Sequence, residues 1–315
     1  MGRLESIQEL GEISQHAQVP VSYQGGQSPP PQPEETVALM EAIEAGGGKV
    51  FGQLDAEDDF SFIRLGETNL SLMGNRGWGS AMKINPRAAR VANFADAEQQ
   101  GVLIQNLENG GAQHIGSFVV TETHHADNEQ YLGRTLQSIA DEQGVEVGRV
   151  LIELSLRDDL ETEFTKTNPI ATETKRKIAE MVTGHESLFQ IGASDAGAHV
   201  TQKCGTGQTS DLLANFVREG HLTLEEAVYQ MTGKNAEQWG MVNRGTLRPG
   251  NHADLVLFDL DKVQAEQSSY VRDMPGEQSR YYRGASGFAA VWVNGALVLR
   301  DGAYVEEGFG NGAVV

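Results

Sequence analysis

The stretch SLFQIGASDAGAHV, residues 187–200, is the most informative in the chain for the fold. An apolar segment runs to Ile191 and is followed by an acid, Asp195, three small residues and a histidine, His199. This pattern is typical of a buried strand whose carboxyl end carries functional side chains. Two interpretations are open. Asp195 either transfers protons in catalysis or caps the following helix and orders the turn.

Upstream of this stretch, helices and strands alternate. Apolar residues three or four positions apart predict a helix over 4–16 and another that begins near Pro33 and stops at the glycines 46–48. Strands are expected over 19–23, 49–54 and 115–122. Alternation of this kind indicates a parallel sheet covered by helices. Further helices are expected over 96–108, 131–144, 146–159, 173–184, 209–220 and 222–233.

Downstream of about Trp239 the pattern becomes all-β. The dipeptide Asn294-Gly295 between two apolar runs is a strong signal for a hairpin. The expected fold is therefore α/β, with residues 1–240 as part of a TIM-like (β/α) barrel and residues 241–315 as a small β-sandwich module. A complete barrel needs ~250 residues and eight strands, and only four or five strands are recognisable in the first segment.

The composition limits the classes of partner. A net charge of −20 argues against nucleic acid and anionic membrane surfaces, because both would repel the chain. The single cysteine, Cys204, excludes an internal disulfide and favours a reducing compartment. No apolar run is long enough to cross a membrane, and no signal peptide is recognisable. We expect a cytoplasmic protein.

Other candidate side chains are less informative. His124 and His125 are adjacent in THHAD, and neighbours on an extended segment point to opposite sides, so they are poor partners for one metal ion. We expect a polar loop there, with one histidine at the surface. Cys204 lies in a glycine-rich loop with no base placed near it by the sequence, so an inert thiol is expected.

Three segments carry a family resemblance: SDAGAH (194–199), RGTLRPGNHADLVLFD (244–259), and the pair DMPG (273–276) and VWVNG (291–295). Together they resemble the carboxyl-terminal part of metal-dependent amidohydrolases, in the D-aminoacylase (N-acyl-D-amino-acid deacylase) branch. The resemblance implies a TIM-like barrel with zinc at its strand ends and hydrolysis of a carbon–nitrogen bond other than a peptide bond. The implied substrate is a small N-acyl or amide compound.

The resemblance also implies roles for particular residues. Asp195 matches the general base, then acid, that works on a metal-activated water, and it is a possible metal contact. His199 is expected to line the substrate pocket. Lys203 is the only cation near the position where the family has an arginine that binds the substrate carboxylate, and it lacks the bidentate fork of arginine.

Departures from the family pattern concern the metal. The His-x-His pair of the family is not in this sequence, and Tyr23 stands where the family has a metal-binding histidine. A tyrosine, with an ordinary pKa of about 10, is a poor zinc ligand at neutral pH. Two explanations are open: the chain is the carboxyl-terminal portion of a longer enzyme, or it is a binding or scaffold protein that lost the metal. For the chain alone we expect no activity, no bound metal, and association through exposed apolar edges.

Overall fold

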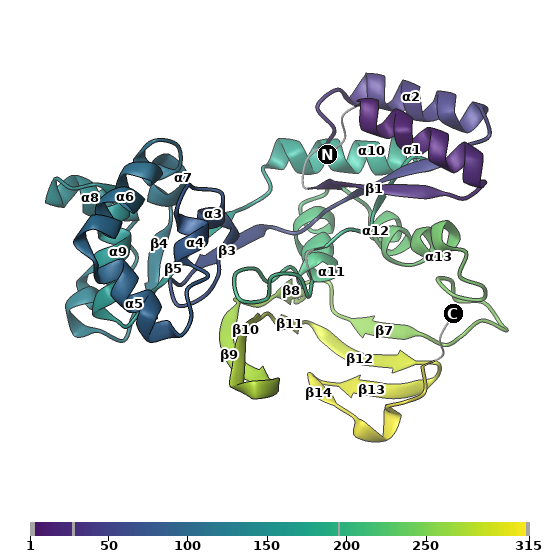
Figure 1. Ribbon diagram of the computed structural model, residues 1–315. Coiled ribbons are helices and arrows are strands. Elements are labelled where there is room, and N and C mark those ends of the chain that lie inside the picture. Colours follow the sequence, from purple (N-terminus) through teal and green to yellow (C-terminus); the bar gives the residue numbers. More distant parts are fainter. Residues whose placement is uncertain (1–3, 27–28, 195, 313–315) are drawn as a thin grey trace.

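The computed structural model describes residues 4–26, 29–194 and 196–312. The chain forms a mixed α/β structure with two lobes (Figure 1). Residues 59–168 form what we call the inserted lobe, on the left of the figure, and the other described residues form the main lobe. Within the described ranges, no helix is both long enough and apolar enough to cross a membrane.

The main lobe contains a parallel sheet of three strands in the order β1 (Val21–Gly26), β2 (Val50–Leu54) and β6 (Phe189–Ile191). Three helices pack on it: α1 (Leu4–Ala17), α2 (Pro33–Ala45) and α10 (Thr172–Gly184). The alternation predicted from the first part of the sequence is thus confirmed. A closed barrel is not seen among the described residues, where only these three strands are parallel.

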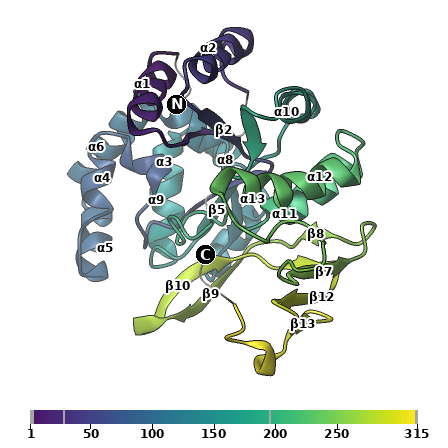
Figure 2. The same ribbon diagram turned by 90° about the vertical axis from the view of Figure 1, so that its right-hand side faces the viewer.

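A second group of helices follows β6. It comprises α11 (Gln208–Asp211), a π-helical segment (Leu212–Val217), α12 (Leu224–Met231) and α13 (Gly233–Trp239). A capping box begins α12, because Thr223 and Glu226 bond each other's backbone N–H groups. These helices lie between the parallel sheet and the carboxyl-terminal strands (Figure 1 and Figure 2).

The inserted lobe has an antiparallel sheet in the order β3 (Asp59–Ile63), β5 (Glu163–Asn168) and β4 (Val119–Glu122). Asp59 pairs with Asn168, so the chain enters and leaves the lobe on neighbouring strands. A hydrophobic core made only of this lobe's residues is centred on Trp78, Phe94 and Phe164. Its helices are α3 (Leu70–Met73), α4 (Trp78–Ala81), α5 (Arg87–Ala95), α6 (Ala97–Glu108), α7 (Ala112–Gly116), α8 (Leu136–Gln143) and α9 (Val147–Arg157), with a 3₁₀ segment at Ala126–Tyr131.

Two predicted elements need correction in this lobe. The strand expected over 115–122 begins as the end of α7, and only 119–122 is extended; it pairs antiparallel with β5 and is not in the parallel sheet. A short apolar run does not distinguish a buried helix end from a strand. The helix expected over 131–144 begins only at Leu136, because the Thr135 hydroxyl accepts the N–H of Ser138 and caps it there.

The carboxyl-terminal residues are all-β, as predicted. Four strands pair antiparallel in the order β14 (Ala303–Tyr304), β13 (Ala296–Arg300), β12 (Phe288–Val293) and β7 (Leu255–Phe258). The predicted hairpin joins β12 to β13, with φ of 50° at Asn294 and 84° at Gly295, as a type I′ turn requires. Smaller pairs are β9 (Ser269–Met274) with β10 (Gln278–Tyr282), and β8 (Gln264–Ala265) with β11 (Ala285–Ser286).

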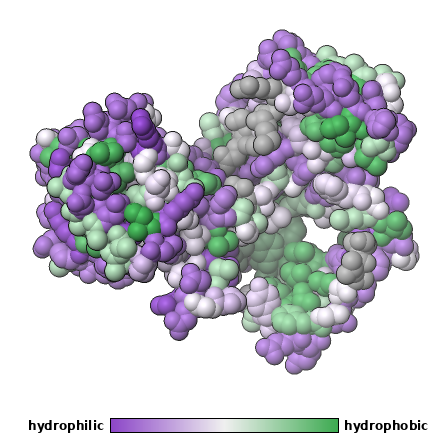
Figure 3. All heavy atoms as spheres, viewed as in Figure 1, coloured by the Kyte–Doolittle hydropathy of each residue, from purple (hydrophilic) through white to green (hydrophobic). Residues whose placement is uncertain are grey.

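The four-stranded sheet leaves many apolar side chains exposed. Val256 and Leu257 on β7 are 53% and 56% exposed. Successive strand residues point to opposite faces, so both faces are open at this edge. Ala290 is the only buried residue that the structure describes in these four strands. Figure 3 shows hydrophobic side chains gathered in the hollow above the sheet.

Candidate functional site

A pocket lies at the carboxyl end of β6, where ligands bind in open α/β sheets. We call it the strand-end pocket; its volume is about 280 Å³. Every described residue that lines it is uncharged, which suits a neutral ligand group. They are Ile191, Gly192, Ser194, Ala196, Gly205, Thr206, Gln208, Thr209, Leu212, Met231 and Asn235.

Asp195 lies outside the described residues, although its neighbours Ser194 and Ala196 line the strand-end pocket. His199 is exposed in a turn with φ of 51°, and its carbonyl accepts the N–H groups of Gln202 and Lys203. The Lys203 ammonium is 3.3 Å from an Asp59 carboxylate oxygen. Neither His199 nor Lys203 is among the described lining residues, so the structure does not bring them together in this pocket.

One wall of the strand-end pocket is held by buried charges that we call the buried ion cluster. The Arg283 guanidinium lies 2.9 Å from Glu57 Oε1 and 3.1 Å from Asp211 Oδ2. Glu57 also accepts the N–H of Gly207 at 2.7 Å, next to Thr206 and Gln208 of the pocket wall. Burial raises the pKa of Glu57 to about 7 and also raises that of Asp211, although the Arg283 guanidinium acts on both carboxylates in the opposite direction.

The sequence interpretation did not single out this cluster. Glu57 comes shortly after the end of β2, so the rule that functional side chains follow parallel strands could have identified it. Arg283 is far away in the chain and has no comparable signal.

Tyr23 lies in the hydrophobic core and does not line the strand-end pocket. It is 8% exposed, and its hydroxyl is 3.8 Å from the sulfur of Met40 on α2. A side chain at Gly52, its partner on β2, would meet this hydroxyl at 2.9 Å. Burial raises the pKa of Tyr23 to about 12, which makes the phenolate a still poorer zinc ligand at neutral pH.

The residues present do not fit a zinc ion. Among the described residues there is no group of three or more His, Cys, Asp or Glu side chains that could hold a metal. His124 is an exposed ring 3.6 Å from Glu122 and 3.8 Å from Asp158, whereas His125 Nδ1 accepts the N–H of Asp127. His124 is thus the more exposed histidine of the pair, and their unsuitability for one metal ion stays a prediction.

The Cys204 thiol is buried, with Thr206 Oγ1 at 3.5 Å as its polar neighbour. Thiols that react as nucleophiles are partly exposed in electropositive surroundings. The structure shows that this thiol is buried, and its lack of reactivity stays a prediction.

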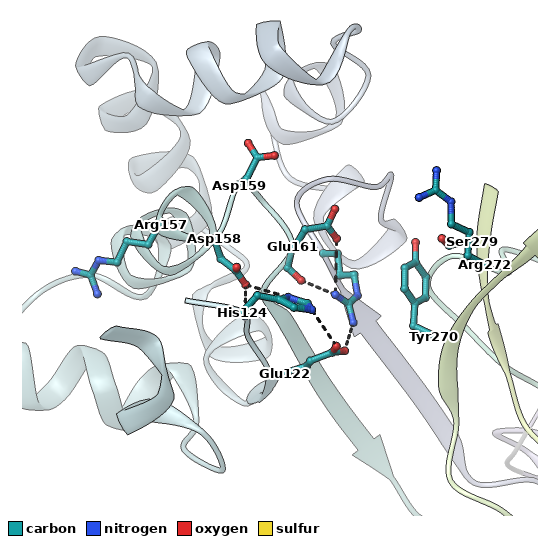
Figure 4. A pocket seen from close by; sticks show the side chains of 10 residues that line it. Glu122, His124, Arg157, Asp158, Asp159, Glu161, Tyr270, Arg272 and Ser279 are labelled. Carbon is teal, nitrogen blue, oxygen red and sulfur yellow. Dashed lines mark hydrogen bonds and ion pairs between the residues drawn. The ribbon is translucent and has the colours of Figure 1, made fainter. Parts of the chain in front are cut away.

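A second cavity, of about 600 Å³, lies between the inserted lobe and the β9–β10 hairpin (Figure 4). We call it the junction pocket. Buried Arg64 contacts Glu122 and lies 2.9 Å from a Glu163 oxygen, and the Tyr281 hydroxyl donates to Glu163. Burial raises the pKa of Tyr281, which keeps this donor protonated. Arg64 and Glu163 of the inserted lobe and Tyr281 of the main lobe thus hydrogen-bond with one another. We interpret this network as a joint between the lobes.

Comparison with known proteins shows which family the carboxyl-terminal third of the chain resembles. Residues 191–299 match the model described as the amidohydrolase family. A segment of 93 residues is 41% identical to the N-acyl-D-aspartate deacylase of Alcaligenes xylosoxydans xylosoxydans, covering 29% of this chain and 17% of that protein. The D-aminoacylase of the same organism is 36% identical over 97 residues, and this match covers 30% of this chain and 18% of the D-aminoacylase.

A solved structure matches over more of the chain. It is the N-acyl-D-glutamate deacylase of Bordetella bronchiseptica, complexed with zinc and a phosphonate inhibitor. The identity is 20% and the TM-score 0.51, covering 96% of this chain and 52% of that one. The chain thus spans about half the length of this relative. The resemblance found in the sequence is confirmed, and the mixed α/β fold is similar to that of this relative.

Proposed function

We propose that this chain, a relative of D-aminoacylase-like amidohydrolases, corresponds to the carboxyl-terminal part of a hydrolase acting on a carbon–nitrogen bond other than a peptide bond. The substrate is a small N-acyl or amide compound. One observation carries the proposal: the family match over 191–299 begins at the strand end that borders the strand-end pocket and includes SDAGAH.

Asp195 is the proposed proton carrier. It accepts a proton from the attacking water and returns it to the leaving amine nitrogen, as a carboxylate general base can. The buried ion cluster bonds the Gly207 N–H, next to Thr206 and Gln208 of the pocket wall. His199 and Lys203 are proposed contacts for the outer end of the substrate. Since the described side chains do not fit zinc, no step is assigned to a metal.

We also propose which larger domains the two parts of the chain belong to. The parallel sheet with its helices would be part of a TIM-like barrel within residues 1–240. The strands after α13 would be one part of a β-sandwich within residues 241–315.

A second candidate is a binding or scaffold role without catalysis. It is favoured by the burial of Tyr23 under α2 and by the lack of a metal-holding group in the part of the chain that the structure describes.

The first experiment measures zinc by elemental analysis in the purified 315-residue chain after dialysis. We expect little bound metal and no turnover of N-acyl-D-amino acids by this chain alone. Near-stoichiometric zinc together with turnover would rule out the binding role and show that the chain builds a working metal site.

The second experiment replaces the proposed proton carrier in the full-length protein that carries this sequence. We expect Asp195→Asn to abolish turnover while the melting temperature stays unchanged, because the amide keeps the shape and loses the base. Asp141→Asn, on the exposed face of α8, is the matched control. Turnover at the wild-type rate in Asp195→Asn would refute the assignment.

A further inference from the structure

The turn that carries His199 and Lys203, residues 199–203, is closed by Gln202, and we call it the contact turn. Gln202 is only 5% exposed, whereas the described residues just before the turn, 196–198, are all exposed. The N–H of Gln202 donates to the His199 carbonyl at 2.9 Å, and the N–H of Lys203 donates to the same oxygen at 3.0 Å. Where Gln202 is held, the backbone of both proposed substrate contacts is therefore held as well.

Gln202 bonds the inserted lobe with its backbone and with its side chain. Its carbonyl accepts the N–H of Phe62 on β3 at 3.0 Å. Its Oε1 accepts the N–H of Leu70, the first residue of α3. The first N–H groups of a helix have no partner within it, so the Leu70 N–H takes its partner from Gln202. Breaking either bond would leave a polar group of a buried residue unpaired, which is costly, so the contact turn is firmly fixed to the lobe.

The main lobe also bonds the contact turn. The Val200 carbonyl accepts the N–H of Tyr281 on β10 at 2.7 Å. Cys204, the residue after the turn, is in one hydrophobic cluster with Phe62 and Tyr281, whose rings stack with their centroids 3.8 Å apart. Phe62 belongs to the inserted lobe and Tyr281 to the main lobe. The contact turn therefore lies where the two lobes meet.

We propose that Gln202 is a positioning residue, which docks the contact turn on the inserted lobe and so places His199 and Lys203 for the outer end of the substrate. Gln202 is not among the described residues that line the strand-end pocket, so it acts through the turn. This inference rests on the proposed function for the roles of His199 and Lys203. It adds a task for the inserted lobe, which is to set the affinity for the substrate.

A purely structural role for Gln202 makes a different prediction. If its bond to Leu70 only stabilised the fold, losing the bond would lower the free energy of unfolding and leave the KM of the folded molecules unchanged. If the bond positions a binding contact, its loss raises KM with kcat unchanged, because the contact is made equally in the ground state and the transition state.

The first experiment measures KM and kcat in the full-length protein that carries this sequence. The substrate is the N-acetyl-D-amino acid that the wild type turns over fastest. Gln202→Met keeps the length of the side chain and removes the acceptor, whereas Gln202→Glu keeps an acceptor oxygen. We expect Gln202→Met to raise KM about tenfold, as the loss of one hydrogen bond can, with kcat and the melting temperature nearly unchanged. Gln202→Glu should restore the wild-type KM.

Two further variants complete this experiment. Gln113→Met, on the exposed face of α7, is the matched control and should leave KM and kcat at their wild-type values. Gln202→Asn withdraws the amide from Leu70 and keeps the position polar. It replaces Gln202→Met if that variant fails to fold, and the same rise in KM is expected from it.

The second experiment tests the docking without any substrate. Hydrogen exchange is followed on the 315-residue chain at single amides by mass spectrometry. We expect the N–H groups of Leu70 and Lys203 to exchange at least about tenfold faster in Gln202→Met, because the opening there becomes easier, and to stay slow in Gln202→Glu. The N–H of Leu151 in α9, within the core of the same lobe, is the internal reference and should not change.

The two experiments separate this inference from the proposed function. No turnover by the full-length wild type would refute the proposed function, and hydrogen exchange would still decide whether Gln202 docks the turn. Wild-type exchange at Leu70 and Lys203 in Gln202→Met, or a folded Gln202→Met with the wild-type KM, would overturn the inference and leave the hydrolase proposal standing.

Discussion

The inserted lobe and the carboxyl-terminal sheet handle their apolar side chains in opposite ways. The inserted lobe encloses Trp78, Phe94 and Leu151 in a core made only of its own residues. The sheet of β7, β12, β13 and β14 is as apolar in sequence, yet it buries Ala290 alone among its described residues. The lobe thus buries its own apolar side chains, whereas the sheet leaves most of its apolar side chains accessible to water.

The comparison also shows that burial follows topology more than composition. Both regions contain short apolar strands, and the described residues of the inserted lobe add seven helices. In the lobe, apolar side chains of helices and strands pack in one core, which stabilises the fold by about 25 cal/mol for each Å² of apolar surface buried. In the carboxyl-terminal sheet Leu257 is 56% exposed and gains little from its hydrophobicity.

The largest expected effect concerns the joint between the lobes. Arg64→Ala leaves the Glu163 carboxylate, which is 8% exposed, without its guanidinium. Removing one partner of a buried ion pair costs about 3–5 kcal/mol of the free energy of unfolding. Urea unfolding measures the loss. Arg272→Ala, which breaks an exposed pair with Glu277, is the control and should cost less than about 1 kcal/mol.

Equal costs for Arg64→Ala and Arg272→Ala would mean that the network at the junction does not join the lobes.

The same truncation in the two regions tests the comparison directly. Leu151→Ala in the core of the inserted lobe should cost about 2–5 kcal/mol, because it creates a cavity at a fully buried site. Leu257→Ala, at a side chain that is 56% exposed, should stay within about 0.5 kcal/mol. Chemical denaturation of both variants gives the numbers. A large loss in the free energy of unfolding for Leu257→Ala would show that Leu257 is already buried by other parts of the protein.

A third prediction concerns how the free energy of unfolding depends on pH. Because the pKa of Glu57 is raised from 4.5 to about 7, the folded chain keeps a proton that the unfolded chain releases between these values. Wild-type stability should therefore fall as the pH rises through this window, by roughly 3 kcal/mol at most. Glu57→Gln has no proton to lose, so it should match the wild type near pH 5 and exceed it at pH 8.

The measurement is the free energy of unfolding at pH 5, 6, 7 and 8. Glu9→Gln, on the exposed face of α1, controls for the loss of one carboxylate elsewhere. A Glu57→Gln variant that is less stable than the wild type at pH 8 would show that Glu57 is ionised and well paired with Arg283.

Substitutions on β7 are expected to have the smallest effect on stability, but they should change how strongly the chain associates with itself. β7 is an edge strand with exposed Val256 and Leu257, and such edges pair with other chains. We expect the wild-type chain to associate in light scattering, and the double variant Val256→Ser, Leu257→Ser to associate less. Val102→Ser, on an exposed apolar residue of α6, is the control. A wild-type chain that is monomeric at high concentration would contradict this prediction.

Local signals in the sequence predicted much of the main lobe. The stripes of α1 and α2, the capping box at Thr223 and the turn at Asn294-Gly295 all report on contacts within a few residues. The inserted lobe was not predicted as a separate unit. Its sheet depends on pairing between β3 and β5, which lie at opposite ends of the lobe's sequence, and neither strand was anticipated.

The candidate site was predicted only in part. The strand end before Asp195 was recognised, because an apolar run that stops at small and acidic residues is a local pattern. Arg283 could not be found in the same way, because its contact with Glu57 is brought about only by the tertiary fold.

The pairing of Asp59 with Asn168 has a consequence for the order of folding. β2 ends at Leu54 and its parallel partner β6 begins at Phe189, so their pairing must close a long loop. Such closure costs entropy and slows folding. If the inserted lobe forms first from its more local contacts, its two ends are already side by side and the loop left to close is short. The lobe would then act as an internal clamp that nucleates the sheet flanking it.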